Sequence, residues 1–197
     1  MIKLFGLWDT QGITVDDPGI KPYISLKPVL VPKTGGGNAK QRFHKSKYSI
    51  VERLINKLMV PGHKGKKHFL TSYRLTGKSI NAYNIVLKTF KIIEAKTKEN
   101  PIKIFVKALE NAAPREEITT IEYGGARYPQ SVECGPQRRI DLALRMMVQG
   151  SYHKSFNHKI KIEETLANEI MKAHTFDKES AAISKKLELE RQADSSR

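Results

Sequence analysis

The fold is decided by one stretch, NPIKIFVKALENAAPREEITTIEYGGARYPQSVECGPQRRIDLALRMMVQG, which spans residues 100–150. Its beginning has the signature of a helix start, with Asn100 as the N-cap and Pro101 at the first helical position. A proline at position 114 would close this helix. A Gly-Pro pair at 135–136 predicts a second helix, which Gly150 would end. The stretch therefore predicts two helices with a non-helical segment between them.

The segment between these two helices, at about 116–134, predicts a β-hairpin. Gly124 and Gly125 suit a two-residue loop, because glycine accepts the positive φ that tight hairpin turns need. This loop places Glu122 opposite Arg127, a favourable cross-strand pair. An isolated hairpin is marginal in water, so it needs the helices at its base or a bound partner. We expect it to project from the molecule; the alternative is a hairpin folded back as a lid on the core.

Helical periodicity predicts four more helices, so the fold class is mainly α: a bundle of about six helices with a protruding β-hairpin between the third and the fourth. On the fourth helix, Asp141 is expected to pair with Arg138 or Arg145. The sixth helix has few apolar groups and is expected to fray or to dock on a partner. Residues 48–197 form this helical domain, and the four additional helices are expected at about 49–60, 78–97, 162–174 and 179–193.

The helix that follows residue 49 carries two predictions about side chains. Ser49 and Glu52 have the spacing of a capping box, in which each side chain accepts from the other residue's free backbone N–H. The apolar residues of this helix form one wide stripe. Arg53 and Lys57 are therefore expected on the opposite side, facing solvent.

Residues 1–47 lack helical periodicity. Four prolines recur between positions 18 and 32, and the segment TGGGN at 34–38 is typical of a flexible break. A basic arm around Phe43 and His44 follows. We interpret residues 1–47 as an irregular, basic N-terminal extension that becomes ordered on RNA.

The charge of the chain is large and unevenly distributed. Its 197 residues carry a formal net charge of +15, with a pI near 9.8. Residues 33–100 hold 16 Lys or Arg side chains and only 3 Asp or Glu. A surface adapted only for solubility mixes the two signs, so this polarised pattern indicates a polyanionic partner. No segment reaches roughly 18 uncharged apolar residues, and a membrane is not a predicted partner.

The sequence shows no arrangement of residues for catalysis or metal binding. Cys134 is the only cysteine, and the six histidines lack metal-ligand spacing. Gly77-Lys78-Ser79 matches the end of a phosphate-binding loop, but Ser72 stands where the motif needs its first glycine. We therefore predict no enzyme activity, no cofactor and no metal. The N-terminus has no signal-peptide pattern, so we expect a cytoplasmic protein.

Folded RNA is the favoured polyanion, because basic and aromatic groups are spread over several loops, an arm and a hairpin. The first alternative is a basic helical DNA-binding or nucleoid protein, which predicts similar affinity for duplex DNA and RNA. The second alternative, which ranks below the first, is an RNA-modifying enzyme. From the basic segments alone we expect RNA contacts at Lys40, Arg42, Lys45, Lys47, His63 and Lys78.

Several motifs, taken together, give the chain a family resemblance. Over about residues 46–195 it resembles the family of the seventh protein of the small ribosomal subunit, in its archaeal and eukaryotic form. Residues 1–45 depart from the bacterial pattern. The motifs are LINKLM at 54–59, Asn100-Pro101, PRE at 114–116, Gly124-Gly125, Arg138-Arg139 through Arg145, LANEI at 166–170 and AISKK at 182–186.

The resemblance implies a structural role in the ribosome. Members of this family bind the 3′ domain of small-subunit rRNA and nucleate assembly of the head. They lie near exit-site tRNA and the path of departing mRNA, and they neighbour other head and platform proteins, including the eleventh. For this chain the resemblance implies rRNA contacts at Arg53, Lys57, Lys64, Lys66, Lys67, Arg115, Arg138 and Arg139, and a hairpin tip facing tRNA and mRNA that comprises Tyr123, Gly124, Gly125, Arg127 and Tyr128.

Overall fold

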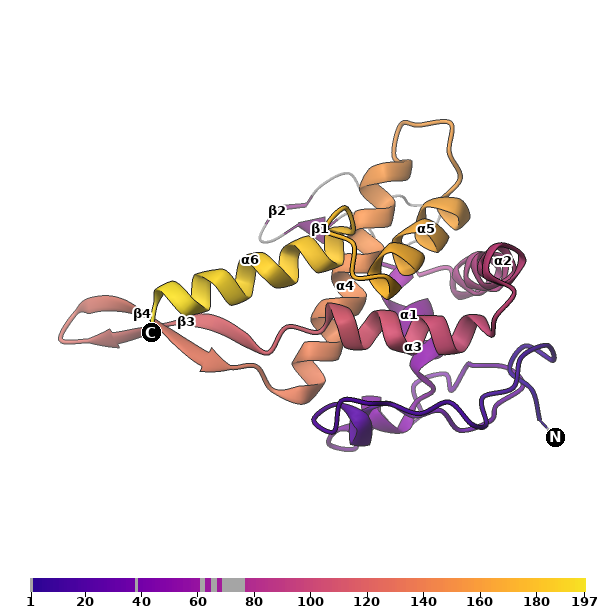
Figure 1. Cartoon of the computed structure of the whole chain (residues 1–197). Coiled ribbons are helices and arrows are strands. Elements are labelled where there is room, and N and C mark those ends of the chain that lie inside the picture. The colour runs from indigo at the N-terminus through magenta and orange to yellow at the C-terminus, as the bar shows by residue number, and fades with distance from the viewer. Residues whose placement is uncertain (1, 38, 61–62, 65–66, 69–76) are drawn as a thin grey trace.

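A computed structural model of the chain describes residues 2–37, 39–60, 63–64, 67–68 and 77–197, with only the backbone given at 63–64 and 67–68. The described part is mainly helical, with a two-stranded antiparallel hairpin between the third and fourth helices, as the sequence predicts (Figure 1). Its helices are α1 (Ile50–Leu58), α2 (Ser79–Thr97), α3 (Pro101–Ala112), α4 (Pro136–Ser155), α5 (Ile162–His174) and α6 (Ala181–Ser195); the strands of the hairpin are β3 (Glu116–Tyr123) and β4 (Ala126–Glu133), and β1 (His63–Lys64) pairs with β2 (Lys67–His68).

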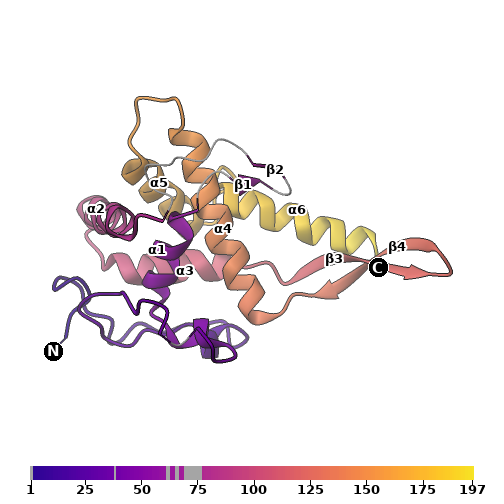
Figure 2. The ribbon, with the colours of Figure 1, turned by 180° about the vertical axis from the view of Figure 1, so that it is seen from behind.

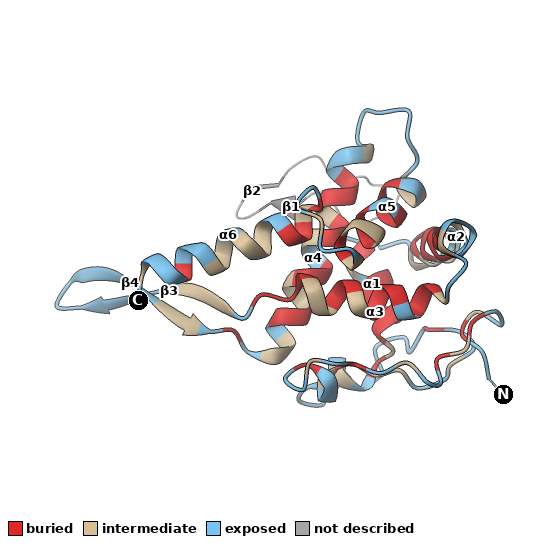
Figure 3. Cartoon of the chain, viewed as in Figure 1, coloured by how far each residue is buried: buried red, intermediate tan, exposed pale blue. Residues whose placement is uncertain are grey.

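The core lies where α5 packs against α2, α3 and α4. Phe90 of α2 and Phe105 of α3 are fully buried with ring centroids 5.8 Å apart, and Leu144 of α4 and Leu166 of α5 are buried in the same cluster. Figure 3 shows this burial concentrated at the crossing of the helices. Burial of an apolar side chain of this size stabilises a fold by about 1.5–3 kcal/mol, so this cluster holds the helices together.

The hairpin projects away from the core, and the alternative of a lid is wrong. Its register pairs Glu122 with Arg127 and Ile121 with Tyr128, as predicted. The tip is exposed on all sides, whereas the base is half-buried against α6 (Figure 3). The sixth helix does not fray, because it lies along β3 and against α4. Figure 2 shows the same arrangement from behind.

Helix α4 does not end at Gly150 but continues to Ser155, so this predicted boundary is wrong. A Cβ atom added to Gly150 would lie 2.5 Å from the Cβ atom of Ala181, which is closer than real Cβ contacts allow. Gly150 thus lets α6 begin directly against α4. The connection between α4 and α5 is correspondingly short, since α5 begins at Ile162.

Helix α1 differs from its prediction in two ways. The Ser49 side chain makes no capping hydrogen bond. The Glu52 side chain does not complete the capping box because it is engaged elsewhere: its Oε1 accepts from the backbone N–H and the hydroxyl of Thr34, at 2.8 and 2.6 Å. Arg53 does not face solvent, because its side chain is only 4% exposed. The predicted placement of Arg53 was therefore wrong, whereas Lys57 is half-buried at the edge of the helix.

The N-terminal segment is irregular but belongs to the same core. Leu4, Trp8 and Ile20 are buried in one apolar cluster with the helices, and the Trp8 ring meets Phe90 edge-on at 5.8 Å. The segment runs below α3 in Figure 1. The side-chain amide of Asn100 donates to the Asp9 carbonyl at 2.7 Å, which ties the start of α3 to it. The residues predicted as an extension are thus packed on the bundle in this structure.

Candidate nucleic-acid interface

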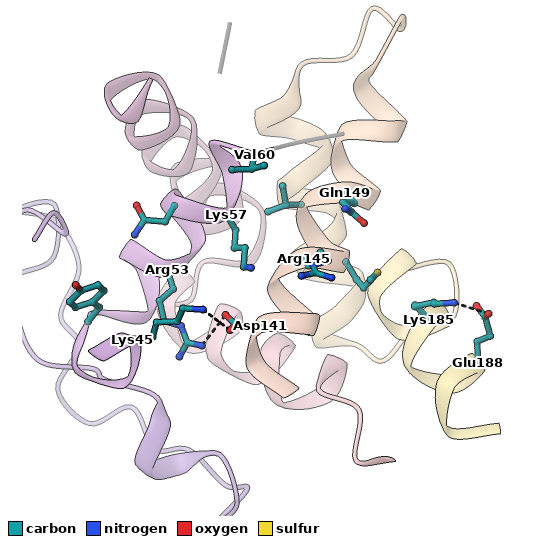
Figure 4. Close-up of a pocket in the computed structure, with 13 residues that line it drawn as sticks. Lys45, Arg53, Lys57, Val60, Asp141, Arg145, Gln149, Lys185 and Glu188 are labelled. Carbon is teal, nitrogen blue, oxygen red and sulfur yellow. Dashed lines mark hydrogen bonds and ion pairs between the residues drawn. The ribbon is translucent and has the colours of Figure 1, made fainter. Parts of the chain in front are cut away.

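A basic hollow of about 1020 Å³ lies between α1 and α4 and reaches the start of α6 (Figure 4). Cationic side chains reach it from four elements: Lys45 from the 3₁₀ turn His44–Lys47, Arg53 and Lys57 from α1, Arg145 from α4 and Lys185 from α6. Among the residues that the structure describes, only two carboxylates, Asp141 and Glu188, line the same hollow. The hollow therefore has an excess of positive charge.

Asp141 organises the floor of the basic hollow. Its two carboxylate oxygens accept from Arg53 Nη2 at 3.3 Å and from Lys45 Nζ at 3.1 Å. Burial alone would raise the pKa of Asp141. The positive charges of Arg53, Lys45 and Lys57 lower it by more than this, so its pKa lies below the usual range. The predicted pairing of Asp141 with Arg138 or Arg145 is wrong, because the turn and α1 bring their cations closer.

Lys57 and Arg145 supply the uncompensated charge of the hollow. Within the described part of the chain, neither has a carboxylate within 4 Å, and both point into the space between α1 and α4 (Figure 4). Burial lowers the pKa of Lys57, and the charges of Arg145, Lys45 and Arg53 lower it further against the opposing effect of Asp141. Two neighbouring cations, neither of which has a direct ion pair with a carboxylate of the described residues, favour binding of a phosphate group.

Arg53 is placed in the hollow as a supporting group and not as an exposed contact. Its Nη1 donates to the Tyr23 carbonyl at 3.1 Å and its Nη2 to Asp141. Its Nε is buried without a partner. Burial lowers the pKa of Arg53, and Asp141 opposes this shift. Arg53 therefore joins the N-terminal segment, α1 and α4, and it sets the position of Asp141 beneath the exposed cations.

The other residues of the predicted basic arm lie on the surface. Lys40 and Arg42 are exposed, and the Arg42 guanidinium lies 5.7 Å from the centroid of the exposed Phe43 ring. Lys47 Nζ donates to the side-chain oxygen of Gln41 at 2.9 Å. These side chains and the exposed Lys78 before α2 are accessible to a ligand, but only Lys45 of this arm lines the hollow.

The three predicted junction arginines have different surroundings. Arg139 is buried, and it donates to the Pro114 carbonyl at 3.0 Å and to Asp17 at 2.7 Å. Arg138 is 61% exposed and pairs with Glu117 at the base of the hairpin, at 2.6 Å. The Arg115 side chain is exposed. Arg139 therefore has a structural role, whereas Arg115 and Arg138 are accessible.

The predicted hairpin tip is fully accessible. Tyr123 is 81% exposed and Tyr128 58% exposed, and Arg127 pairs loosely with Glu122 at 3.5 Å. Gly124 and Gly125 both have positive φ, as the predicted loop requires. A projecting pair of aromatic rings beside a guanidinium is suited to stacking on unpaired bases.

The lysine-rich segment at 63–68, which the sequence predicts as a loop, is only partly described. The backbone of residues 63–64 pairs with that of 67–68 in the short antiparallel β1–β2 ladder, where the sequence predicts only a loop. These positions include the predicted contacts His63, Lys64 and Lys67. Lys66 lies outside the described residues.

Sequence reasoning missed Arg145 and Lys185 as members of the hollow. Arg145 follows Asp141 by one helical turn, a spacing that predicts an ion pair and therefore did not indicate a free cation. Nothing in the sequence links Lys185 to α1. The described residues contain no cluster of His, Cys, Asp and Glu suited to a metal. No helix in the described ranges is long and apolar enough to cross a membrane.

The chain is similar to a known protein family and to a named relative. The family described as ribosomal protein S7p/S5e matches residues 20–197. The small ribosomal subunit protein uS7 of Nanoarchaeum equitans (strain Kin4-M) is 58% identical over 196 residues, which cover 100% of this chain and 99% of that protein.

Proposed function

Because the chain belongs to the ribosomal protein S7p/S5e family, we propose that its basic hollow binds the 3′ domain of small-subunit rRNA. As a member of this family it is a structural constituent of the small ribosomal subunit in the cytoplasm, and not an enzyme. Its partners are accordingly rRNA and ribosomal neighbours. Membership in this family removes the reason for considering a nucleoid protein or an RNA-modifying enzyme.

The observation that carries the proposal is the pair of uncompensated cations in the basic hollow. Lys57 and Arg145 have no carboxylate within 4 Å in the described part of the chain, and burial keeps the pKa of Lys57 below its usual range. A phosphate between them would restore the pKa of Lys57 and release counterions from the RNA. The exposed cations Lys40, Arg42, Lys47 and Lys78 extend the same kind of contact along the surface.

We further propose that the protein nucleates assembly of the subunit head, with its hairpin directed at exit-site tRNA and departing mRNA. The shape of the hairpin supports this proposal: its base is fixed by α6, whereas Tyr123, Arg127 and Tyr128 project away from the core. The proposal includes contact with neighbouring head and platform proteins, in particular the eleventh. This part of the proposal rests on the resemblance of the sequence motifs to the family.

Titration of the protein with a 3′-domain rRNA fragment at several salt concentrations tests the rRNA proposal. We expect tighter binding to this RNA than to duplex DNA of equal length, and a steep salt dependence. Changing Lys57 and Arg145 together to Ala should weaken RNA binding and reduce the slope of log K against log salt by about 2.

A matched control removes two cations that already have carboxylate partners. Lys88 pairs with Glu163 and Lys103 with Glu99, both at 3.6 Å, and both lysines are exposed. The double change of Lys88 and Lys103 to Ala should alter the salt slope much less. An identical slope for the wild type and the Lys57 and Arg145 variant would overturn the assignment of the hollow.

A further inference from the structure

A second hollow, of about 460 Å³, lies beside the basic one, between α1, the start of α2 and residues 31–36. The two hollows share Tyr48 and Asn56 in their linings, so they adjoin along α1. The second hollow has mostly apolar walls. Their main side chains are Pro32, Tyr48, Met59, Ile80 and Tyr83, with Glu52 among them.

Glu52 is a buried carboxylate without a cationic partner. The residue is 5% exposed, and within the described residues it has no Lys, Arg or His within 4 Å. Both of its hydrogen bonds come from Thr34, and both go to Oε1, at 2.8 and 2.6 Å. Burial of an ionised carboxylate without a positive partner is costly, and its second oxygen still has the capacity to accept.

Tyr48 provides a second polar group without a partner in the lining. The residue is 7% exposed, and its hydroxyl makes no hydrogen bond. A hydroxyl can both donate and accept, whereas the carboxylate only accepts. An apolar hollow with a few unsatisfied polar groups is the usual form of a site for a flat, heteroaromatic ligand.

We propose that this second hollow holds an unpaired nucleobase of the bound RNA, one that carries an exocyclic amino group. The amino N–H of adenine, cytosine or guanine would donate to Glu52, and the ring would lie against Met59, Ile80 and Tyr83. Proteins recognise unpaired RNA bases in this way, by contact with the ring face and hydrogen bonds to the base edge. Uracil has no amino group and is the base that this site disfavours.

The surrounding charges favour a nucleotide over a cationic side chain of a neighbouring protein. Lys33 lines the same hollow, and Lys57 lines the adjoining one. Both would repel a Lys or Arg side chain, whereas a nucleotide brings its own phosphate to them. This inference rests on the proposed rRNA binding and adds base recognition to it.

The change Glu52→Gln tests the inference by the sign of its effect. It removes a negative charge from a basic protein, so phosphate contacts alone predict unchanged or tighter RNA binding. Base recognition predicts the opposite, a loss of about tenfold with an unchanged salt slope. The control is Glu94→Gln, which removes the same charge from an exposed position on α2 and should not weaken binding. Equal affinities of the two variants would overturn the inference.

A second variant and a second readout keep the test valid if Glu52→Gln unfolds. Ile80 is 65% exposed at the start of α2, so Ile80→Ala should leave the thermal unfolding temperature unchanged and weaken RNA binding several-fold. Chemical probing of base edges in the complex should show one unpaired A, C or G protected by the wild type and reactive with Ile80→Ala. No change at any nucleotide would overturn the inference.

Failure of this inference can be told from failure of the proposed function. If the wild type binds the 3′-domain fragment with a steep salt slope, but neither variant alters affinity or protection, only the base site is wrong. If the wild type does not prefer this RNA over duplex DNA, the proposed function itself is wrong. Titration with AMP, CMP, GMP and UMP is an additional experiment. Micromolar binding of a free nucleotide, without protection of any RNA base in the complex, would overturn the assignment of this hollow to RNA.

Discussion

Gly150 and Glu169 meet where α4, α5 and α6 converge, and each is fixed by its surroundings. Gly150 faces the Cβ atom of Ala181 with no room for a methyl group. The side chain of Glu169 is 0% exposed and accepts from Lys154 Nζ at 2.8 Å, from the Ser180 hydroxyl at 2.7 Å and from the backbone N–H of Ala182 at 3.1 Å. One small residue and one acid thus determine where α6 begins.

The first prediction concerns this junction. Gly150→Ala should destabilise the protein by about 1–3 kcal/mol, although alanine is the better helix former, because α6 must move. Chemical unfolding followed by circular dichroism would measure the change. Adding Ala181→Gly should recover part of the loss, whereas Gly37→Ala, at an exposed position without close contacts, should have little effect. A Gly150→Ala protein as stable as the wild type would show that the junction yields easily.

The second prediction concerns Asp141, whose pKa in the folded state lies below its usual value of 3.8. A lowered folded-state pKa means that the ionised group stabilises the fold above about pH 4 and loses this effect as the pH falls through the folded pKa. Asp141→Asn should therefore cost about 2 kcal/mol at pH 7, because Arg53 loses its charged partner.

The pH dependence separates this electrostatic effect from simple loss of packing. The difference in unfolding free energy between wild type and Asp141→Asn should shrink as the pH falls below 3.8 towards the lowered folded-state pKa of Asp141. Urea unfolding at pH 7 and pH 3 would measure it. Asp194→Asn, at a position 69% exposed, is the matched control and should change little at either pH. A difference as large at pH 3 as at pH 7 would mean that charge is not the cause.

At the scale of elements, the hairpin depends on α6. The Glu190 carboxylate accepts from the backbone N–H of Arg115 at 3.0 Å, and Arg197 pairs with Glu116 at the base of β3. The base strands are half-buried against α6 and the tip is exposed. An isolated hairpin would be marginal, so α6 supplies the order that the strands lack by themselves.

The third prediction is that the helical core does not depend on the tip of the hairpin, whereas the base of the hairpin depends on α6 for its order. Deletion of residues 122–128, with the strands rejoined by two glycines, should leave cooperative thermal unfolding of the helices unchanged. Deletion of residues 190–197 should instead speed hydrogen exchange at the amides of β3 and β4, with little change in the core. Loss of cooperative unfolding in the tip deletion would show that the tip belongs to the core.

The elements that the sequence predicted well carry strong local signals. Asn100 caps α3 with its side-chain oxygen, which accepts from the N–H of Ile102 at 3.0 Å, and the two glycines fix the register of the hairpin. The errors occur where a distant residue decides. Gly150 ends no helix because Ala181 lies against it, and Glu52 leaves the capping box because Thr34 takes its oxygen.

At the scale of the whole molecule, the N-terminal segment completes the core. Phe5 and Trp8 contact each other edge-on, at 5.9 Å between ring centroids, and both contact Phe90. Lys107 of α3 bridges Asp16 at 2.6 Å and Glu110 at 3.2 Å. The apolar residues of this segment are scattered among prolines and glycines, so they show no period that would mark them as core.

The fourth prediction tests this packing without RNA. Trp8→Ala should destabilise the isolated protein by about 3–5 kcal/mol, because it leaves a cavity beside Phe90. Trp8→Phe is the matched control: it keeps an aromatic ring and removes an indole N–H that is buried without a partner, so it should cost much less. Equal stability of Trp8→Ala and the wild type would support a segment that becomes ordered only on RNA.

The candidate site was predictable in kind but not in geometry. The excess of cations in residues 33–100 indicates RNA, and Lys45, Arg53 and Lys57 do come together. Asp141, the carboxylate that pairs with Lys45 and Arg53, lies more than 80 residues further along the chain, so no local pattern could reveal that Arg53 is held inside while Lys57 has no ion pair among the described residues.

The contact between Trp8 and Phe90 also determines when part of the core can form during synthesis. Trp8 leaves the translating ribosome about 80 residues before its partner, a delay on the order of 4–16 s at the usual speed of translation. During this interval the early aromatic rings have no native surface to cover them, although the basic stretch that follows is already available to nucleic acid. The nascent chain can therefore bind nucleic acid before its aromatic core can form.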